Sequence, residues 1–302
     1  MSERVGFIGL GNMGRGLSAN LCRKGFPLSV FDINPEPVAH LRGLGAHTPG
    51  SAGEVADASD IVFTCLPNTA SVEEVVLGSG GVFSRLGKGS LFVETSTIDP
   101  LATDRLAAEA ARLGIAFVDA PLGRLATHAE RGESLFMVGA ADRDYARVKP
   151  LLDALGTTVH HCGAVGTGIR TKLVNNYLAI VSCAFNAEAV ALSQKFGLSL
   201  EKTLDVVHGT TGTNGQLKLA WATKVFKGDT EPGFTIDLAH KDLTLIVNAA
   251  NAANVPMPIG AVAREAFNNA RTQGHGAKDF SAMGDIHCEI AHVARPRLPA
   301  GS

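Results

Sequence analysis

The stretch Val5-Gly6-Phe7-Ile8-Gly9-Leu10-Gly11-Asn12-Met13-Gly14 decides the fold, because an apolar run leads directly into the spacing G-x-G-x-x-G. We expect a strand over residues 4–9 and a helix over 14–24. Gly9 permits the tight turn out of the strand, Gly11 lets a pyrophosphate approach the backbone, and Gly14 lets helix and strand pack closely. The amides of Asn12 and Met13 then face the phosphates at the helix N-terminus. The stretch therefore predicts a dinucleotide site.

An acidic residue, Asp32, ends the second predicted strand, residues 28–32. A carboxylate in this place accepts hydrogen bonds from the adenosine ribose hydroxyls and repels a 2′-phosphate. The next residues, Ile33, Asn34 and Pro35, offer no cation to neutralise such a phosphate. The sequence therefore predicts NAD in preference to NADP as the cofactor. The other interpretation of Asp32, a capping residue in the turn before Pro35, is compatible with this role.

Short apolar runs alternate with helix-period segments in the first half of the chain, which is typical of a parallel sheet covered by helices. The expected strands are residues 4–9, 28–32, 61–66, 90–94, 115–119, 134–139 and 157–162, and the expected helices are 14–24, 35–44, 71–77, 100–113 and 142–155. After residue 163 the pattern becomes helical only, with a long helix over 169–196 and others starting near Ser199, Asp237 and Ile259. We therefore predict an α/β chain with two domains: an NAD-binding Rossmann domain, 1–163, and an all-α domain for substrate binding and oligomerisation, 164–302.

The composition argues against several classes of partner. The 302 residues are 45% hydrophobic and 19% charged, with a formal net charge of -2 and no Lys/Arg cluster, so no nucleic acid or membrane surface is expected to bind. The five cysteines form no C-x-x-C pair, which argues against a disulfide framework and favours a cytoplasmic location. The opening residues lack the pattern of a secretion signal, and the uncharged stretch 173–187 is too short to span a bilayer. An apolar helical domain favours a homodimer or homotetramer.

A second candidate site lies at the start of the long helix. Lys172 is followed by Asn175, Asn176 and Ala179 at i+3, i+4 and i+7, so the four residues share one helix face. Burying such polar groups is costly, which points to a cleft, although a solvent-exposed first turn is the simpler alternative. Reduction of a carbonyl leaves negative charge on oxygen, and an ammonium both donates the proton and stabilises the anion. Lys172 is therefore the expected acid/base, with Asn176 holding the ammonium and the substrate oxygen in register.

Five segments carry a family resemblance over nearly the whole chain. They are GFIGLGNMG at residues 6–14, Glu94-Thr95-Ser96-Thr97 followed by Pro100, Asp119-Ala120-Pro121, Gly166-x-Gly168-x-x-x-Lys172-x-x-x-Asn176, and Asp237-Leu238-Ala239-His240-Lys241-Asp242. Together they resemble the β-hydroxyacid dehydrogenase family, which includes 3-hydroxyisobutyrate dehydrogenases and tartronate semialdehyde reductases. The resemblance implies a Rossmann domain plus a helical domain, with Lys172 as the catalytic acid/base. It also places Leu66 and Thr97 near the nicotinamide half of NAD, with Lys241 reaching the cofactor from the second domain; Pro67, next to Leu66, is a further expected cofactor-binding residue.

The chain departs from the family pattern after Asp119-Ala120-Pro121. Family members that bind a carboxylate usually continue with Val-Ser-Gly-Gly, whereas Gly123 stands here in place of the serine and Arg124 in place of a glycine. The guanidinium suits a strongly acidic oxyanion, and the variant resembles the 3-sulfolactaldehyde reductases, in which residues matching Arg124 and Asn175 hold a sulfonate. Ala179 occupies a position where that subfamily carries a hydroxyl. The alternative is that Arg124 is an exposed loop arginine paired with Glu130 or Glu133.

By this resemblance the expected reaction is NADH-dependent reduction of 3-sulfolactaldehyde to 2,3-dihydroxypropane-1-sulfonate, with Lys172 as acid/base. Gly123, Arg124, Asn175, Thr97 and Ala179 are the expected substrate-binding residues. The alternatives are reduction of a carboxylated semialdehyde (succinic, methylmalonate or tartronate semialdehyde), an idle NAD-binding module, which should lack the lysine, and imine reduction. No metal is expected, because the Cys/His pair on the last helix lacks third and fourth ligands at sensible spacing.

Overall fold

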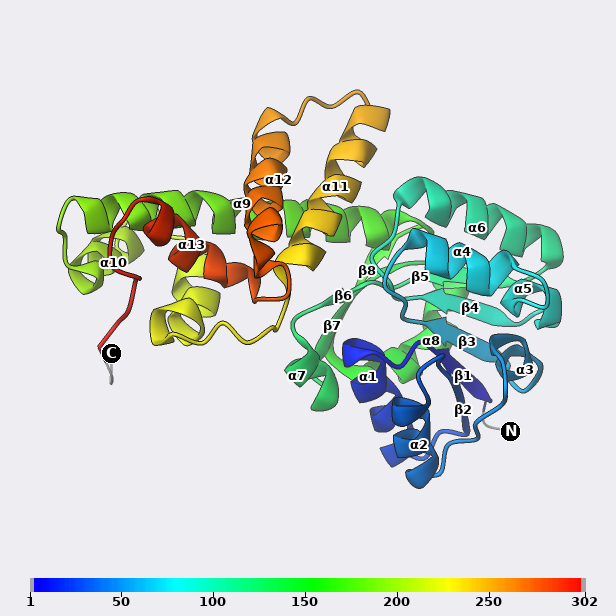
Figure 1. The fold of residues 1–302 in the computed structure, drawn as a ribbon. Helices are drawn as coiled ribbons and strands as arrows, with labels where there is room; N and C mark the ends of the chain where they lie inside the picture. Colours follow the sequence, from blue (N-terminus) through cyan, green and yellow to red (C-terminus); the bar gives the residue numbers. More distant parts are fainter. Residues whose placement is uncertain (1–2, 300–302) are drawn as a thin grey trace. The chain divides into compact units, whose positions relative to one another are not determined.

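The computed structural model describes residues 3–299, and the chain divides into two compact units, Met1–Lys172 and Leu173–Ser302. Figure 1 shows that the first unit combines a sheet with helices and that the second is built from helices. This confirms the predicted α/β fold class with its helical C-terminal part. The division between the units falls inside a long helix, α9 (Thr167–Lys195).

The sheet of the first unit has eight strands in the order β2-β1-β3-β4-β5-β7-β6, with β8 paired to β7. The strands are β1 (Val5–Ile8), β2 (Leu28–Phe31), β3 (Ile61–Thr64), β4 (Leu91–Glu94), β5 (Ala116–Asp119), β6 (Leu122–Gly123), β7 (Ser134–Gly139) and β8 (Gly156–Gly163). The first five run parallel, while β7 is antiparallel to both β5 and β6. Seven of these strands lie where the sequence predicts them, and the two-residue β6 was not predicted.

His47 relates this strand order to a known type of sheet. It forms an isolated parallel bridge with Ser29 on the outer side of β2, and its backbone bonds to Leu28 O and Val30 N at 2.9 and 2.8 Å. The bridge occupies the place of a third strand, so the order corresponds to 3-2-1-4-5-6, the order of dinucleotide-binding sheets. The chain then crosses to the far side of β1 to form β3. The switch point beside β1 is where such sheets bind ligands, at the carboxyl ends of the strands.

In the described part of the first unit, eight helices accompany the sheet. They are α1 (Asn12–Arg23), α2 (Pro35–Gly43), α3 (Ala52–Asp57), α4 (Thr69–Leu77), α5 (Val82–Arg85), α6 (Pro100–Leu113), α7 (Ala126–Glu130) and α8 (Asp142–Leu155). The predicted bounds of α6 and α8 match the observed ones. The sequence analysis missed α3, α5 and α7, because four to six residues are too few to display a helical period.

Alternating side chains of the central strands fill two separate cores. Phe7 and Phe63 point to the face that α1 and α8 cover, and stack with ring centroids 5.8 Å apart. Val62 and Phe92 point to the opposite face, where residues of α3, α4, α5 and α6 enclose them. Both cores consist mainly of apolar side chains, and the strands are buried on both sides as a parallel sheet requires. Polar side chains that could bind a ligand are therefore expected at the two edges of the sheet, where the strands begin and end.

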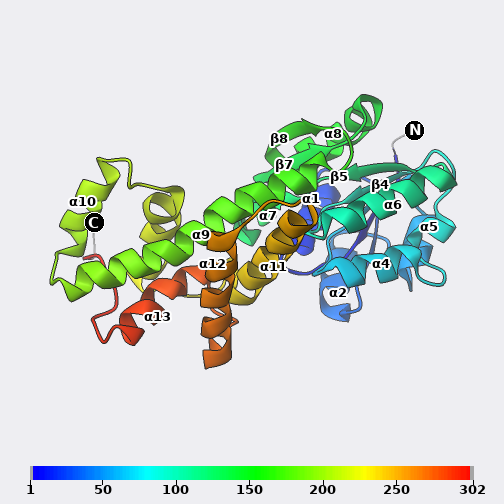
Figure 2. The same cartoon turned by 90° about the horizontal axis from the view of Figure 1, so that it is seen from above.

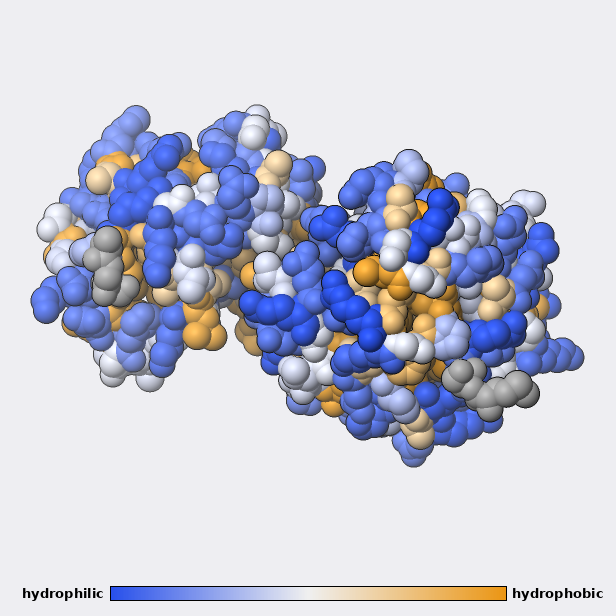
Figure 3. Space-filling view, turned by 90° about the horizontal axis from the view of Figure 1, so that it is seen from below, coloured by the Kyte–Doolittle hydropathy of each residue, from blue (hydrophilic) through white to orange (hydrophobic). Residues whose placement is uncertain are grey.

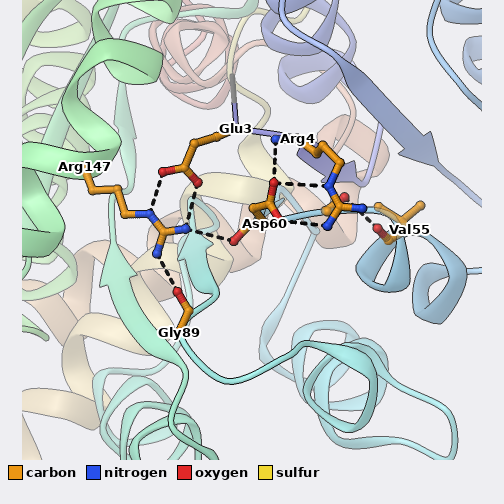
Figure 4. A network of polar contacts seen from close by, with 7 residues as sticks. Glu3, Arg4, Val55, Asp60, Gly89 and Arg147 are labelled. Carbon is orange, nitrogen blue, oxygen red and sulfur yellow. Dashed lines mark hydrogen bonds and ion pairs between the residues drawn. The ribbon is translucent and has the colours of Figure 1, made fainter. Parts of the chain in front are cut away.

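The edge at which the strands begin is closed by ion pairs (Figure 4). Arg147 of α8 binds the Glu3 carboxylate at 2.7 Å and the backbone oxygen of Gly89 at 2.7 Å. Arg4 binds Asp60 at 2.7 Å. A cavity of about 680 Å³ lies here, but its guanidinium groups are already paired. It also lies at the end of the sheet opposite the glycine turn, so we do not place the active site in it.

The second unit packs helices around a core that contains Trp221, Phe226 and Phe267. Beyond α9 its helices are α10 (Leu200–His208), α11 (Ile236–Ala252), α12 (Pro258–Ala270) and α13 (Met283–Ile290), with short π or 3-10 turns at Gln216–Trp221, Val225–Lys227, Arg271–His275 and Phe280–Ala282. Figure 2 shows α11 and α12 as a neighbouring pair. On the face seen in Figure 3, hydrophilic side chains cover most of the surface, with smaller apolar groups between them. Within residues 3–299, no helix combines the length and apolar character needed to cross a membrane.

Candidate active site

The glycine turn between β1 and α1 has the geometry that its spacing predicts. Gly9 has a φ of 92°, and a Cβ there would lie 2.3 Å from the backbone oxygen of Cys65. A Cβ on Gly14 would lie 2.0 Å from Gly9 O, so both positions require glycine for close packing. A Cβ on Gly11, in contrast, would meet no atom within 4 Å. Packing does not explain the second glycine, whereas a ligand passing over the turn would.

The N-terminus of α1 fits the phosphates of a dinucleotide. The helix begins at Asn12, no side chain caps it, and its first turn carries no acidic residue. The backbone N–H groups of Asn12 and Met13 therefore create a positive potential that no capping side chain and no acid in the first turn of the helix neutralises. With the open space over Gly11, this is a cradle for a pyrophosphate.

Asp32, just after β2, is tied to the glycine turn. Its Oδ2 accepts a hydrogen bond from Leu10 N at 2.6 Å, and its Oδ1 accepts one from Asn34 N at 2.7 Å. The second bond is the turn-capping role considered above. Each carboxylate oxygen has two lone pairs, so one remains on each for ribose hydroxyls. The side chain is only partly buried, which leaves it accessible to them.

A buried hydrogen-bond network joins the loops that carry Leu66, Pro67 and Thr97. Glu94, at the end of β4, accepts from Thr64 Oγ1 and from Ser96 N, both at 2.6 Å. The Ser96 hydroxyl in turn accepts from Leu66 N at 2.7 Å. Burial raises the pKa of Glu94 to about 7, against the opposing effect of the hydrogen bonds from Ser96 and Thr64. The network holds the loops after β3 and β4 in one arrangement at the carboxyl edge of the sheet.

The predicted catalytic residues all lie on α9, as expected. Lys172 is the last residue of the first unit, and Asn175, Asn176 and Ala179 follow on the same helix in the second. Lys172 and Ala179 are partly buried, Asn175 is exposed and Asn176 is buried. A buried amide must be hydrogen-bonded, so the partner of Asn176 matters.

That partner is Asp242 of α11. Its Oδ2 accepts from Asn176 Nδ2 at 2.6 Å, and its Oδ1 lies 3.0 Å from Lys241 Nζ. Asn175 Nδ2 donates to Asn176 Oδ1 at 3.2 Å. Three predicted site residues of the second unit are thus joined through one buried carboxylate. Asp242 stood inside a quoted motif but had been given no role.

Arg124 adopts a left-handed backbone conformation with a φ of 72°, which glycine favours and which fits the family's usual residue at this position. Its Nη1 donates to Glu133 O at 2.6 Å and to Thr157 Oγ1 at 2.9 Å, and its Nη2 donates to Thr158 Oγ1 at 3.3 Å. The side chain is exposed and bonds the backbone of Glu133, not a carboxylate. A Cβ on neighbouring Gly123 would come within 3.3 Å of Leu135, so a serine there would require Leu135 to shift.

Two further carboxylates were quoted as motif residues without a function. One is Glu94, described above, and the other is Asp119, at the end of β5, which binds the start of α9. Their places in the motifs could have marked both carboxylates as functional, but the residues that they bind lie far away in the sequence. Of the i,i+4 pair Cys288 and His292, Cys288 is buried on α13 (Met283–Ile290), whereas His292 lies beyond the end of that helix with a φ of 52°, so the two residues do not share a helix face. Among residues 3–299 no group of three His, Cys, Asp or Glu side chains is placed to hold a metal ion.

Comparison with known proteins places this arrangement in a family. A profile described as the NAD binding domain of 6-phosphogluconate dehydrogenase matches residues 4–163, and one described as NAD-binding of NADP-dependent 3-hydroxyisobutyrate dehydrogenase matches residues 166–286. The chain is 39% identical to the 3-sulfolactaldehyde reductase of Escherichia coli (strain K12) over 92% of its own length and 94% of that protein. The chain belongs to the 3-hydroxyisobutyrate dehydrogenase family.

Two further comparisons cover the chain to a similar extent. The 2-(hydroxymethyl)glutarate dehydrogenase of Eubacterium barkeri is 37% identical over 93% of this chain and 94% of its own. A solved structure of the Mycobacterium tuberculosis 3-hydroxyisobutyrate dehydrogenase superposes with a TM-score of 0.87 at 30% identity, covering 95% of this chain and 99% of that one. The protein is therefore an NAD(P)-binding oxidoreductase of the hydroxyacid and semialdehyde type, which confirms the predicted family and enzyme class.

Proposed function

We propose that this enzyme reduces 3-sulfolactaldehyde to 2,3-dihydroxypropane-1-sulfonate with NADH. The observation that carries the proposal is the 39% identity over 92% of the chain to a 3-sulfolactaldehyde reductase. The physical reason to prefer a sulfonate is Arg124, a cation in a segment where the family usually binds a carboxylate with a serine and glycines. The reaction is reversible, so the same residues serve the alcohol oxidation.

The protein must supply a proton while the bound dinucleotide supplies the hydride. In this proposal the Lys172 ammonium donates its proton to the carbonyl oxygen, and in the reverse direction the neutral amine accepts the proton of the alcohol. Asn176 lies one helical turn further along α9. Its Nδ2 donates to Asp242, and its Oδ1 is the amide atom that can accept from the ammonium. That oxygen takes one bond from Asn175 and has a second lone pair.

Arg124 retains capacity for an anion. A guanidinium has five N–H donors, and the bonds to Glu133, Thr157 and Thr158 use three of them. Two donors therefore remain for a sulfonate, while the other three hold the group in place. Asn175 is exposed and is the second residue that we propose for the sulfonate. We place Gly123, the neighbour of Arg124 in the chain, at the substrate as well, together with Thr97 and Ala179.

A carboxylated semialdehyde is the second candidate substrate. Support comes from the 37% identity to 2-(hydroxymethyl)glutarate dehydrogenase, a level close to that of the sulfolactaldehyde reductase. Succinic, methylmalonate and tartronate semialdehydes are the compounds to compare. In this case the guanidinium of Arg124 would have only a structural role, through its hydrogen bonds to Glu133 and Thr157.

The two substrates are separated by NADH oxidation measured side by side on sulfolactaldehyde and the three semialdehydes. We expect the sulfonate to give the highest kcat/KM, and a preference for any carboxylate would overturn the proposal. Arg124→Ala should then raise KM for the sulfonate, while Arg131→Ala, which removes a neighbouring arginine that pairs with Glu133, should leave it unchanged. Lys172→Ala should abolish turnover with NADH binding intact.

We also propose that NAD is preferred over NADP. The support is Asp32, whose charge repels a 2′-phosphate and which is fixed against the glycine turn through Leu10 N. Asp32→Ser should raise kcat/KM for NADPH relative to NADH. Glu36→Gln, an exposed acid in the next turn, serves as the control and should leave the ratio unchanged. A wild-type enzyme that uses both cofactors equally would contradict the proposal.

We also propose that the protein is cytoplasmic and that it forms a homodimer or homotetramer through its helical unit. Leu178, Phe185 and Leu192 are spaced seven residues apart on α9 and are 64%, 49% and 53% exposed, a stripe suited to a helix of a second copy. A groove of about 290 Å³ between α9 and α12 adjoins it, lined by Phe185 and Val262 among others. Light scattering after gel filtration should give a dimer or tetramer, which Phe185→Asp should dissociate. A wild-type monomer at micromolar concentration would contradict the proposal.

A further inference from the structure

The first turn of α9 is held by a side chain from another element. The Asp119 carboxylate, at the end of β5, accepts from Gly166 N at 2.6 Å through Oδ1 and from Ile169 N at 2.7 Å through Oδ2. The residue is 1% exposed. Gly166 immediately precedes the helix and Ile169 is its third residue. The two amides are those that a capping box satisfies, and neither Gly166 nor Ile169 has a side chain able to do so.

The backbone segments around this carboxylate are in close contact. A Cβ on Gly139 of β7 would lie 2.4 Å from Asp119 Oδ1, and a Cβ on Gly168 of α9 would lie 2.3 Å from Met137 O. The helix start therefore rests directly on the ends of β5 and β7. A shift of the first turn would have to break both hydrogen bonds of Asp119 or separate these backbones.

A second tether on the same turn is of a different kind. Arg170 binds the Asp104 carboxylate at 2.8 Å, and both side chains are about half exposed. Exposed ion pairs are screened by water and contribute little to a fixed geometry. The buried bonds of Asp119 are thus the stronger restraint, and the Asp104 pair provides a matched control.

We propose that Asp119 is a positioning residue: its buried carboxylate fixes the first turn of α9 on the sheet and thereby sets where Lys172 presents its amine. This inference rests on the proposed role of Lys172. Lys172 lies three residues after Ile169, less than one helical turn away. The α9 backbone carries any tilt of the first turn directly to Lys172. A proton donor displaced by about 1 Å loses roughly a hundredfold in rate.

The test compares Asp119→Asn with Asp104→Asn. An asparagine accepts from one amide but turns its own N–H₂ toward the other, so one of the two cap hydrogen bonds is lost at nearly constant volume. We expect kcat to fall about ten- to a hundredfold per NADH-binding site, with the dissociation constant for NADH unchanged. Hydrogen exchange of the segment 165–173 should accelerate. Asp104→Asn should leave all three unchanged.

Counting active sites by NADH fluorescence separates positioning from loss of folded protein, because unfolded chains bind no NADH. If Asp119→Asn keeps the wild-type kcat per site while Lys172→Ala is inactive, the inference is overturned and the proposed function stands. If Lys172→Ala retains turnover, the proposed function fails instead. Should Asp119→Asn not fold, Asp119→Ser, which is smaller and can accept one bond, allows the same comparison.

Discussion

Asp242 accepts a hydrogen bond from the side-chain amide of Asn176 at 2.6 Å, and this bond decides which way the amide faces. Nδ2 points to the carboxylate, so Oδ1 is turned toward Asn175 and is available to further donors. The other carboxylate oxygen lies 3.0 Å from Lys241 Nζ. A single buried acid therefore orients one residue that we place in proton transfer and one that we place at the cofactor.

Replacing Asp242 by alanine should be costly for both stability and turnover. The Asn176 amide would be buried without its acceptor, which costs about 1–3 kcal/mol in the free energy of unfolding. We expect kcat to fall as well, because the Asn176 side chain loses its fixed orientation. Urea denaturation and steady-state kinetics measure the two effects. Asp237→Ala, on the same helix but in an exposed ion pair with Arg271, should change the free energy of unfolding by much less, and equal losses in the two variants would contradict this account.

Glu94 should make the stability of the wild-type protein fall as pH rises. Its pKa is about 7 in the folded state against about 4.5 when unfolded, so between these values the folded state holds a proton that the unfolded state has released. Raising the pH through that window lowers the free energy of unfolding by roughly 1.4 kcal/mol per pH unit for one proton. Glu94→Gln cannot titrate and can still accept from Ser96 N. The variant should therefore gain stability relative to wild type from pH 5 to pH 7.

Urea denaturation at pH 5, 6 and 7 measures this difference, and a difference that does not change with pH would exclude titration of Glu94 in the window. Glu109→Gln is the control. Glu109 is partly exposed, and its hydrogen bond with Arg112 lowers its pKa, so its stabilising contribution is lost as pH falls. This variant should show no gain between pH 5 and pH 7.

Local patterns were enough to predict most of the fold. The strands from β1 to β5 are buried on both faces and read as continuous apolar runs, and Gly or Pro marks the ends of the longer helices. Short elements were not predicted, because a periodic pattern can be recognised only over several residues. The strand β6 has two residues, and His47 forms a single bridge. The bridge matters, since it shows that the sheet follows the dinucleotide-binding order.

The candidate site was predictable where one segment carries it and not where distant segments meet. The glycine turn and the α9 face each follow from spacing within a dozen residues. Glu94 and Thr64 are 30 residues apart, Asp119 and Ile169 are 50 apart, and Asn176 and Asp242 are 66 apart. Nothing in the sequence pairs such residues, because a carboxylate at a strand end does not specify which backbone amide it will meet.

Arg124 should carry backbone strain that glycine would relieve. A non-glycine residue in the left-handed region costs about 1 kcal/mol, and Arg124 has a φ of 72°. Arg124→Ala loses the bonds to Glu133 and Thr157 and keeps the strain, whereas Arg124→Gly loses the bonds and the strain together. We therefore expect the glycine variant to be the more stable of the two by about that amount, measured by urea denaturation. If Arg124→Ala were instead more stable than Arg124→Gly, the loop would relax to a different backbone conformation in the variants.

Gly11 and Gly14 should respond to alanine in opposite ways, although they belong to one motif. A Cβ on Gly14 would lie 2.0 Å from Gly9 O, so Gly14→Ala must push α1 off the strand and lower the free energy of unfolding by about 1–3 kcal/mol. A Cβ on Gly11 meets no protein atom within 4 Å, so Gly11→Ala should fold with wild-type stability. Its methyl group would instead stand where the pyrophosphate approaches the backbone, and NADH affinity should fall. Thermal unfolding without cofactor, together with NADH titration by fluorescence, distinguishes the two effects. Wild-type NADH affinity in Gly11→Ala would mean that the phosphates do not pass over this turn.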